Sequence, residues 1–226
     1  MIKLRMAGAK TAELFLYERI GAGFFGGGVD AKSVADELKA LGKIETIMVR
    51  INSEGGSVFD GFAIYNLLAR HPARIEVDVD GMALSIASVI AMAGDTIRVA
   101  KNSMMMIHDP HGGADGSAED LRRTADLMDQ VKVNIVDTYA TRTGQSPEKV
   151  AEMMTAETWL TAEDAVALGF ADAVTQEVKM AATFDPSRFK NVPKGFGVAG
   201  SQPAANVHRV RLAAANERAK GYGLKP

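Results

Sequence analysis

The 226-residue sequence predicts an α/β fold, and three observations lead to that prediction. Short apolar runs typical of strands alternate with segments of helical periodicity through most of the chain. Hydrophobic residues make up 47% of the sequence and charged residues 24%, as in ordinary globular domains. The length suffices for one substantial core. We therefore expect one main domain in which helices cover a sheet.

The first half of the chain repeats a rhythm of strand followed by helix. Each helix is marked by apolar residues three or four positions apart, as at Val34, Leu38 and Leu41. A turn at 52–56 separates the second strand from the second helix, and Gly81 is expected to end the third strand. In order, we expect a strand at 13–20, a helix at 34–41, a strand at 44–51, a helix at 58–71, a strand at 74–80, a helix at 85–93, and strands at 96–99 and 104–107.

Three Ser or Thr residues mark helix starts in the second half. A hydroxyl at the N-cap accepts a hydrogen bond from a free backbone N–H, and an acidic residue three positions later completes a capping box. The first of these helices is the longest expected element and ends before Gly144. The caps are Ser117 with Asp120, Ser146 followed by Pro147, and Thr161 with Asp164.

Composition divides the chain into a domain at 1–175 and a tail at 176–226. The tail holds nine Lys and Arg against three acidic residues, which gives it a net charge of +6. Because the whole chain has a net charge of −2, the first 175 residues carry a net charge of −8. Glycine and proline interrupt the tail, so we expect little regular structure there apart from a basic helix at 204–220.

Several classes of protein are excluded or disfavoured by composition. With no cysteine, the chain has no disulfide, thiol nucleophile or thiolate metal site. The net charge of −2 gives no overall attraction to nucleic acid or anionic lipid. The longest apolar run, 82–94, is too short to span a bilayer, and the N-terminus has no signal-peptide pattern. We therefore expect a cytoplasmic protein that binds neither membranes nor nucleic acid.

Ser85 and His108 are the candidate catalytic residues. A serine hydroxyl becomes a good nucleophile when a neighbouring imidazole removes its proton. Ser85 lies at the start of an apolar helix, where free backbone N–H groups can stabilise an oxyanion, and His108 ends a predicted strand. Taken alone, each residue has a simpler interpretation, a helix cap for Ser85 and a structural histidine for His108. The 52–57 loop is likewise either an ordinary turn or a donor of backbone amides.

Taken together, the sequence segments around these residues resemble the proteolytic subunit of Clp protease, ClpP, and especially the ClpP-related head-maturation proteases of tailed phages. The matching motifs occur in order over residues 13–175. They are Asn52-Ser-Glu-Gly-Gly56, Gly81-Met-Ala-Leu-Ser85, Met106-Ile-His108-Asp-Pro110, Gly144-Gln-Ser146, and Thr161-Ala-Glu-Asp-Ala165 followed by Gly169-Phe-Ala-Asp172.

The resemblance implies a crotonase-like, ClpP-like spiral of repeated ββα units, with the long helix as a handle. It implies that Ser85 is the nucleophile and His108 the general base. The backbone amides of Gly56 and Ile86 would form the oxyanion hole. The segment with Gly112 and Gly113 would bind substrate as an added β-strand.

Three departures from the family pattern bear on function. Glu157 stands where the family usually has the aspartate of the triad, and Asp172 and Asp109 are the alternatives for that role. Glu54 replaces the usual proline and adds a carboxylate near the cleft. Only about a dozen residues precede the first predicted strand, so we expect curtailed axial loops, no coupling to a Clp-type ATPase, and self-contained proteolysis.

The sequence therefore predicts a serine endopeptidase that forms an acyl-enzyme and requires no metal or organic cofactor. The resemblance implies a homo-oligomeric ring, stacked through the handle, that acts on phage capsid or scaffold proteins and on its own tail. The alternatives are an inactive scaffold subunit with this fold, a crotonase-fold acyl-CoA enzyme, and a Ser-Lys peptidase of the signal-peptide-peptidase type.

Overall fold

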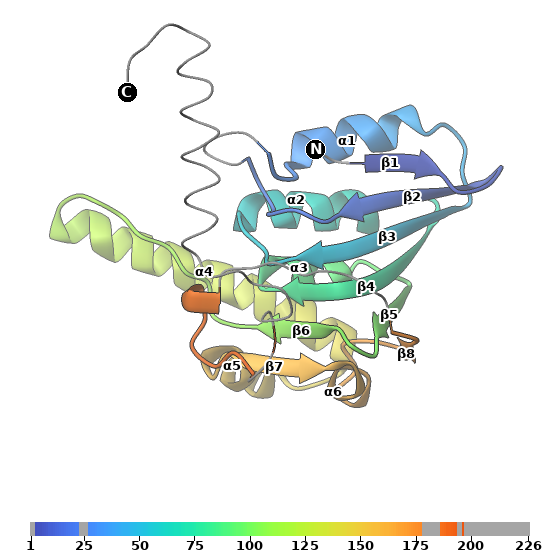
Figure 1. Cartoon of the computed structure of the whole chain (residues 1–226). Coiled ribbons are helices and arrows are strands. Elements are labelled where there is room, and N and C mark those ends of the chain that lie inside the picture. The colour runs from blue at the N-terminus through green and yellow to red at the C-terminus, as the bar shows by residue number, and fades with distance from the viewer. Residues whose placement is uncertain (1–2, 23–26, 178–185, 194–195, 197–226) are drawn as a thin grey trace, which may run out of the picture.

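The computed structural model describes residues 3–22, 27–177, 186–193 and 196. An eight-stranded sheet forms its centre, and helices pack against it (Figure 1). The strands are β1 (Lys3–Met6), β2 (Thr11–Leu16), β3 (Thr46–Ser53), β4 (Arg74–Leu84), β5 (Thr96–Ala100), β6 (Met104–Ile107), β7 (Thr158–Thr161) and β8 (Ala173–Thr175). The helices are α1 (Ala31–Ala40), α2 (Val58–Ala69), α3 (Ile86–Ala91), α4 (Ala118–Thr143), α5 (Pro147–Thr155), α6 (Ala162–Ala167) and the 3₁₀ helix η1 (Pro186–Arg188).

The sheet is mainly parallel and forks at β4. Five strands pair in parallel, in the order β2, β3, β4, β5 and β8. Two pairs are antiparallel: β1 with β2, and β7 with β6. The first part of β4, from Glu76 to Val79, pairs with β5. Its last part, from Met82 to Leu84, pairs in parallel with β6. The fork lets one long strand support both the core sheet and the β6–β7 pair.

The fold class is confirmed as mixed α/β, with corrections to individual strands. The prediction that Gly81 ends a strand was wrong, because β4 continues through this residue to Leu84. The strand expected at 13–20 lies at Thr11–Leu16, and β1 precedes it. Strands β7 and β8 were not expected, because segments of three or four residues are too short to show a periodic pattern.

The predicted helix starts are confirmed by their caps. Ser117 and Thr161 form capping boxes with Asp120 and Asp164, and the Ser146 hydroxyl accepts a hydrogen bond from the Lys149 N–H. Each cap satisfies backbone donors that the helix leaves free.

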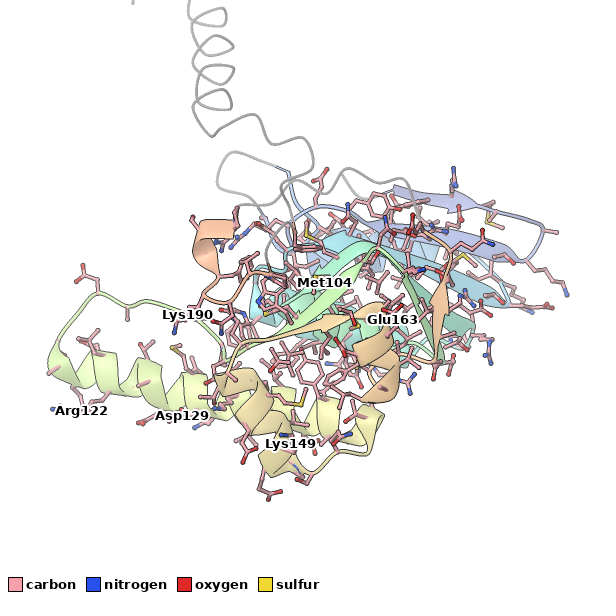
Figure 2. All side chains as sticks on the ribbon, turned by 60° about the horizontal axis from the view of Figure 1, so that its bottom comes forward. Met104, Arg122, Asp129, Lys149, Glu163 and Lys190 are labelled. Atoms are coloured by element: carbon pink, nitrogen blue, oxygen red, sulfur yellow. The ribbon has the colours of Figure 1, made fainter. Side chains whose placement is uncertain are left out.

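Helix α4 extends well beyond the sheet (Figure 1). Its buried residues, Val131, Ile135, Val136 and Tyr139, all belong to the second half of the helix. In Figure 2, Arg122 and Asp129 lie on the part that projects away from the sheet. The predicted handle is thus a long helix that this chain covers only in part.

A small apolar cluster lies beside the main core. Met82, Leu84 and Met106 are buried in it, and Trp159, Phe189 and Phe196 pack against it. The last two residues belong to the region predicted as the tail. The helix expected at 204–220 lies outside the described residues. Within the described part of the chain, no helix combines the length and hydropathy needed to cross a membrane.

Candidate active site

Parallel pairing of β4 and β6 brings Ser85 and His108 together. Leu84 is the register partner of Met106, so both strands end at the same edge of the sheet. The Ser85 N–H donates to the Met106 carbonyl at 2.9 Å. His108 comes directly after the last residue of β6, and its Nε2 lies 2.8 Å from the Ser85 Oγ. Residues 23 positions apart in the chain are thereby held in hydrogen-bond contact.

The backbone of Ser85 adopts an unusual conformation. Its φ of 56° and ψ of −130° lie where residues other than glycine are rare and strained. Ser85 is the N-cap residue of α3 by position, but its side chain makes no capping hydrogen bond. The interpretation of Ser85 as an ordinary side-chain cap is therefore wrong, because its hydroxyl faces His108 instead of the helix.

The loop after β3 packs against the turn that carries Ser85. Gly55 has a φ of 89°, and a Cβ there would lie 2.7 Å from the Leu84 carbonyl oxygen and 3.3 Å from the Ile86 nitrogen. Gly56 has a φ of 150°, and a Cβ there would lie 2.1 Å from the Ile20 carbonyl oxygen. Only glycine allows this approach. Ile86 begins α3, so its N–H has no acceptor within the helix.

Two buried hydroxyls lie behind the turn that carries Ser85. The Ser88 Oγ donates to the Ser85 carbonyl at 2.6 Å, and it also lies 3.1 Å from the Met106 carbonyl oxygen. The Tyr139 hydroxyl lies 2.8 Å from the Ser88 Oγ. Because Tyr139 belongs to α4, this chain of hydrogen bonds connects the long helix to the carbonyl of the predicted nucleophile.

His108 lies in an environment that favours the neutral imidazole. Its pKa is lowered to about 4, chiefly by burial and to a smaller extent by the nearby charges of His111 and Arg188. The carboxylates of Glu157 and Asp109 act in the opposite direction. The His108 and His111 rings lie 4.5 Å apart between centroids. A neutral imidazole is the form that accepts a proton, so the environment suits a general base.

Among the described residues, no group hydrogen-bonds to the buried Nδ1 of His108. Glu157 is buried, with a φ of 50°, and it raises the pKa of His108 as a nearby charge. Its Oε1 accepts hydrogen bonds from the backbone N–H groups of Lys190 at 2.6 Å and Asn191 at 2.7 Å. The Trp159 indole N–H also donates to this oxygen, at 3.3 Å.

The two alternative carboxylates have other partners. Asp109 accepts from the Thr155 hydroxyl at 3.1 Å and forms an ion pair with Lys132 at 2.9 Å. Asp172 accepts from the backbone N–H of Ile97 at 2.7 Å and from Arg142 at 2.6 Å. Asp172 therefore connects the segment before β8 to β5 and α4.

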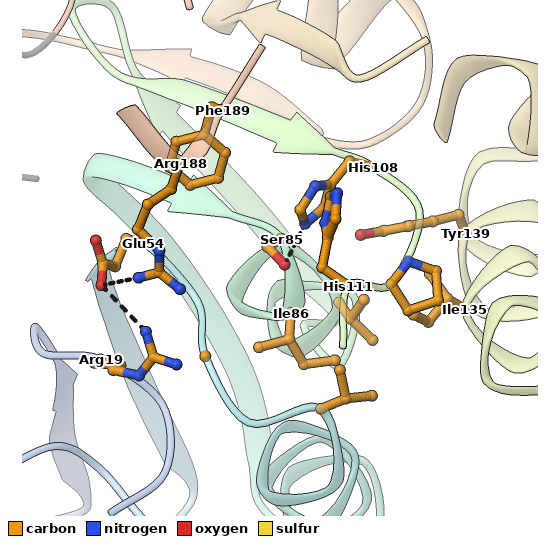
Figure 3. Close-up of a pocket in the computed structure, with 14 residues that line it drawn as sticks. Arg19, Glu54, Ser85, Ile86, His108, His111, Ile135, Tyr139, Arg188 and Phe189 are labelled. Atoms are coloured by element: carbon orange, nitrogen blue, oxygen red, sulfur yellow. Dashed lines mark hydrogen bonds and ion pairs between the residues drawn. The ribbon is translucent and has the colours of Figure 1, made fainter. Parts of the chain in front are cut away.

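A cavity of about 130 Å³ opens beside Ser85 and His108 (Figure 3). Tyr139 and Ile135 lie on one side of Ser85, and Arg19, Glu54 and Arg188 lie on the other. Glu54 forms ion pairs with Arg19 at 3.6 Å and with Arg188 at 3.0 Å. The carboxylate predicted near the cleft is confirmed in the cavity wall.

The structure brings some predicted site residues together and leaves others apart. Gly56, Ser85, Ile86 and His108 all line the cavity. Gly112 and Gly113 lie in the irregular segment between β6 and α4 and are exposed. The described part of the chain holds no group of three or more His, Asp and Glu side chains positioned to bind a metal ion.

Sequence reasoning missed several residues around the cavity. Ser88 and Tyr139 form hydrogen bonds behind the turn that carries Ser85, and only the apolar stripe of α4 gave a signal for Tyr139. His111, whose ring lies beside that of His108, was given no role by the sequence analysis. Arg188 and Phe189 line the cavity from a segment that the sequence assigned to a tail. No local pattern indicates such a long-range contact.

Fold and site define an α/β protein with a serine–histidine pair at the carboxyl ends of parallel strands. This chain belongs to the Clp protease family, whose model matches residues 24–178. It is thus a member of the ClpP-type serine protease family.

Curated relatives agree with this assignment. The ATP-dependent Clp protease proteolytic subunit 1 of Chlamydia abortus is 35% identical over 161 residues, which cover 67% of this chain and 84% of the relative. The ATP-dependent Clp protease proteolytic subunit 2 of Thermobifida fusca is 32% identical over 173 residues, which cover 73% of this chain and 84% of the relative. A solved ClpP1 mutant from Listeria monocytogenes shares the fold, with a TM-score of 0.64 at 22% identity, over 73% of this chain and 91% of that chain.

Proposed function

We propose that this protein is a serine endopeptidase that cleaves peptide bonds through an acyl-enzyme. The observation that carries the proposal is the 2.8 Å contact between Ser85 Oγ and His108 Nε2, made from a strained turn. The hydroxyl of Ser85 is directed at a base that burial keeps neutral. This is the arrangement that nucleophilic catalysis by serine requires.

In the proposed reaction, Ser85 Oγ attacks the carbonyl carbon of the scissile bond and its proton passes to His108 Nε2. The developing oxyanion accepts hydrogen bonds from the backbone N–H groups of Gly56 and Ile86. When the C–N bond breaks, His108 donates the proton to the leaving amine. A water molecule, deprotonated by His108, then hydrolyses the ester and regenerates Ser85.

Glu157 is our choice for the third member of the triad. It is buried near His108, and its charge raises the pKa of the imidazole, as a group that stabilises the imidazolium must do. Its left-handed backbone also supports a functional role, because strained residues gather at active sites. In the described structure its Oε1 is held by Lys190 and Asn191.

Labelling with a fluorophosphonate tests the nucleophile. We expect one adduct per chain, at Ser85, and hydrolysis of a fluorogenic peptide. Ser85→Ala should lose both, with turnover lower by about 10⁶-fold, while folding and assembly are preserved. Peptide hydrolysis that persists in purified Ser85→Ala would overturn the proposal.

An inactive scaffold subunit is the second candidate. It is favoured by one observation, the absence of any hydrogen bond to His108 Nδ1 among the described residues. Fluorophosphonate labelling separates the two functions, since a scaffold subunit that folds and assembles normally would remain unlabelled.

We further propose capsid or scaffold proteins of a tailed phage as substrates, and a homo-oligomeric ring as the working assembly. The two curated relatives described above are named ATP-dependent, whereas we propose that this chain cleaves without an ATPase. Cleavage of such a substrate by the purified chain alone would support the proposal. Cleavage only after addition of a Clp-type ATPase would contradict it.

A further inference from the structure

The segment Pro186–Asn191, here called the strap, lies against the candidate active site. It contains η1 and is separated from Ser85 by about a hundred positions in the sequence. Arg188 and Phe189 line the cavity together with Ser85 and His108 (Figure 3). The strap therefore forms part of the wall of the site.

Three groups of the domain hold the strap, and each recognises a different feature. Glu54 pairs with the Arg188 guanidinium at 3.0 Å. The Phe189 ring lies 5.6 Å from the Trp159 ring in an edge-to-face arrangement, and 6.1 Å from the His108 ring. Glu157 accepts the backbone N–H groups that follow, at 2.6 and 2.7 Å.

These contacts are those of a docked peptide. Two consecutive backbone N–H groups bonded to one buried carboxylate oxygen fix the main chain, and charge-assisted bonds of this kind are strong. A further bond, from the Asn191 side chain to the Ala156 carbonyl at 2.8 Å, fixes the C-terminal end of the strap. The carboxylate and the aromatic ring then select the side chains.

We propose that Glu54, Trp159 and Glu157 form a docking site for a peptide with an arginine followed by an aromatic residue, and that the chain's own Arg188–Phe189 occupies it. This inference rests on the proposed peptidase function. The occupied site excludes substrate, because Phe189 lies beside His108 and Arg188 bridges to the loop that carries Gly56. It also keeps the Glu157 oxygen on the strap instead of on His108.

The docking is expected to be reversible. The Arg188 side chain is 48% exposed, so solvent screens and weakens its ion pair with Glu54. Arg19 lies 3.6 Å from the same carboxylate and neutralises Glu54 when Arg188 leaves. A substrate segment of the same chemistry can therefore replace the strap.

The test uses full-length chains carrying Arg188→Glu together with Phe189→Ala. Lys39→Glu, an exposed charge reversal on α1, is the matched control. The rate of fluorophosphonate labelling at Ser85 should rise by about tenfold in the double variant, the gain expected if roughly nine in ten wild-type molecules are blocked. The control should label at the wild-type rate.

Trp159 supplies a readout that does not depend on activity, because it is the single tryptophan of the chain. Undocking of Phe189 should shift its emission to the red and increase its quenching by acrylamide. A synthetic peptide of residues 186–193 added to the double variant should reverse both changes and slow labelling. A peptide with Glu and Ala in place of Arg188 and Phe189 should do neither.

The outcomes distinguish the two proposals. If no chain is labelled, wild type and variants alike, the peptidase proposal fails, whereas the docking site is still judged by Trp159 emission and peptide addition. If wild type and double variant label Ser85 at equal rates, or the variant labels more slowly, the occlusion of the site is overturned. Unchanged Trp159 emission in the variant overturns docking itself.

Discussion

At the scale of single residues, the site depends on two strained positions. Ser85 and Glu157 are the non-glycine residues with positive φ in the described part of the chain. Such conformations are unfavourable by about 1 to 3 kcal/mol each, so the surrounding structure must hold them. Both are residues for which the sequence predicts a catalytic role.

Three variants, each replacing one candidate carboxylate by its amide, show which of the three residues is the third member of the triad. Glu157→Gln should lower kcat by about 10³ to 10⁴-fold, because the amide does not stabilise the imidazolium of His108. Asp109→Asn and Asp172→Asn should change kcat by only a few fold. Their partners, Thr155 and Lys132 for Asp109 and Ile97 and Arg142 for Asp172, stay in place when the strap that holds Glu157 leaves. Peptide hydrolysis with substrate in excess measures all three, and a larger loss in either aspartate variant would reassign the third position.

At the scale of elements, parallel strand ends create the site. The carboxyl ends of β3, β4 and β6 lie at one edge of the sheet, and their loops provide Gly56, Ser85 and His108. Helix α3 then begins directly after Ser85. Helices α2 and α4 pack closely against α3, and we expect these contacts to stabilise the position of Ser85 at this edge of the sheet.

The contact between α3 and α4 is tested by a double-mutant cycle on Ser88 and Tyr139. Ser88→Ala leaves the buried Tyr139 hydroxyl without its partner and should lower the free energy of unfolding by about 1 to 3 kcal/mol. Tyr139→Phe removes one hydrogen bond and should lower it by about 1 kcal/mol. We expect the double variant to be more stable than Ser88→Ala. Urea unfolding provides the values, and simple additivity would show that the hydroxyls are not coupled.

The contact between α2 and α3 has no room for an additional methyl group. A Cβ at Gly61 would lie 2.1 Å from Cγ1 of Ile86. Gly61→Ala should therefore displace the start of α3, lower stability by about 1 to 3 kcal/mol despite the helix propensity of alanine, and slow labelling of Ser85. Gly8→Ala, which has open space around it, is the control and should leave thermal unfolding and labelling unchanged.

At the scale of the whole molecule, the buried histidine couples folding to pH. His108 has a pKa of about 4 in the folded chain, with Glu157, Asp109, His111 and Arg188 facing it, against about 6.5 in an unfolded chain. The unfolded state therefore binds more protons between these values, so the free energy of unfolding rises with pH from about 4 to about 6.5. The contribution of His108 is fully present above pH 6.5 and is lost as pH falls toward 4.

Urea unfolding across this pH range measures the effect. His108→Gln should flatten the slope between pH 4 and 6.5, leaving the smaller contribution of His71, whose pKa burial also lowers. An unchanged slope in His108→Gln would contradict the assignment.

By itself, the sequence determined the fold class, the order of most elements and the serine–histidine pair. These follow from local information: hydrophobic periodicity, capping residues and glycine turns act over a few positions, and each motif places its residue at a strand end. The short strands β7 and β8 escaped prediction because three or four residues carry too little of this local pattern.

Only the tertiary structure shows which groups surround Ser85 and His108. The fork of β4, the hydroxyls of Ser88 and Tyr139, and the strap with Arg188 and Phe189 depend on contacts between segments far apart in the chain. The partners of Glu157 belong to the same category. These contacts are favourable because their surfaces are complementary, and such surfaces form only when the chain has folded. A local pattern in the sequence therefore does not predict them.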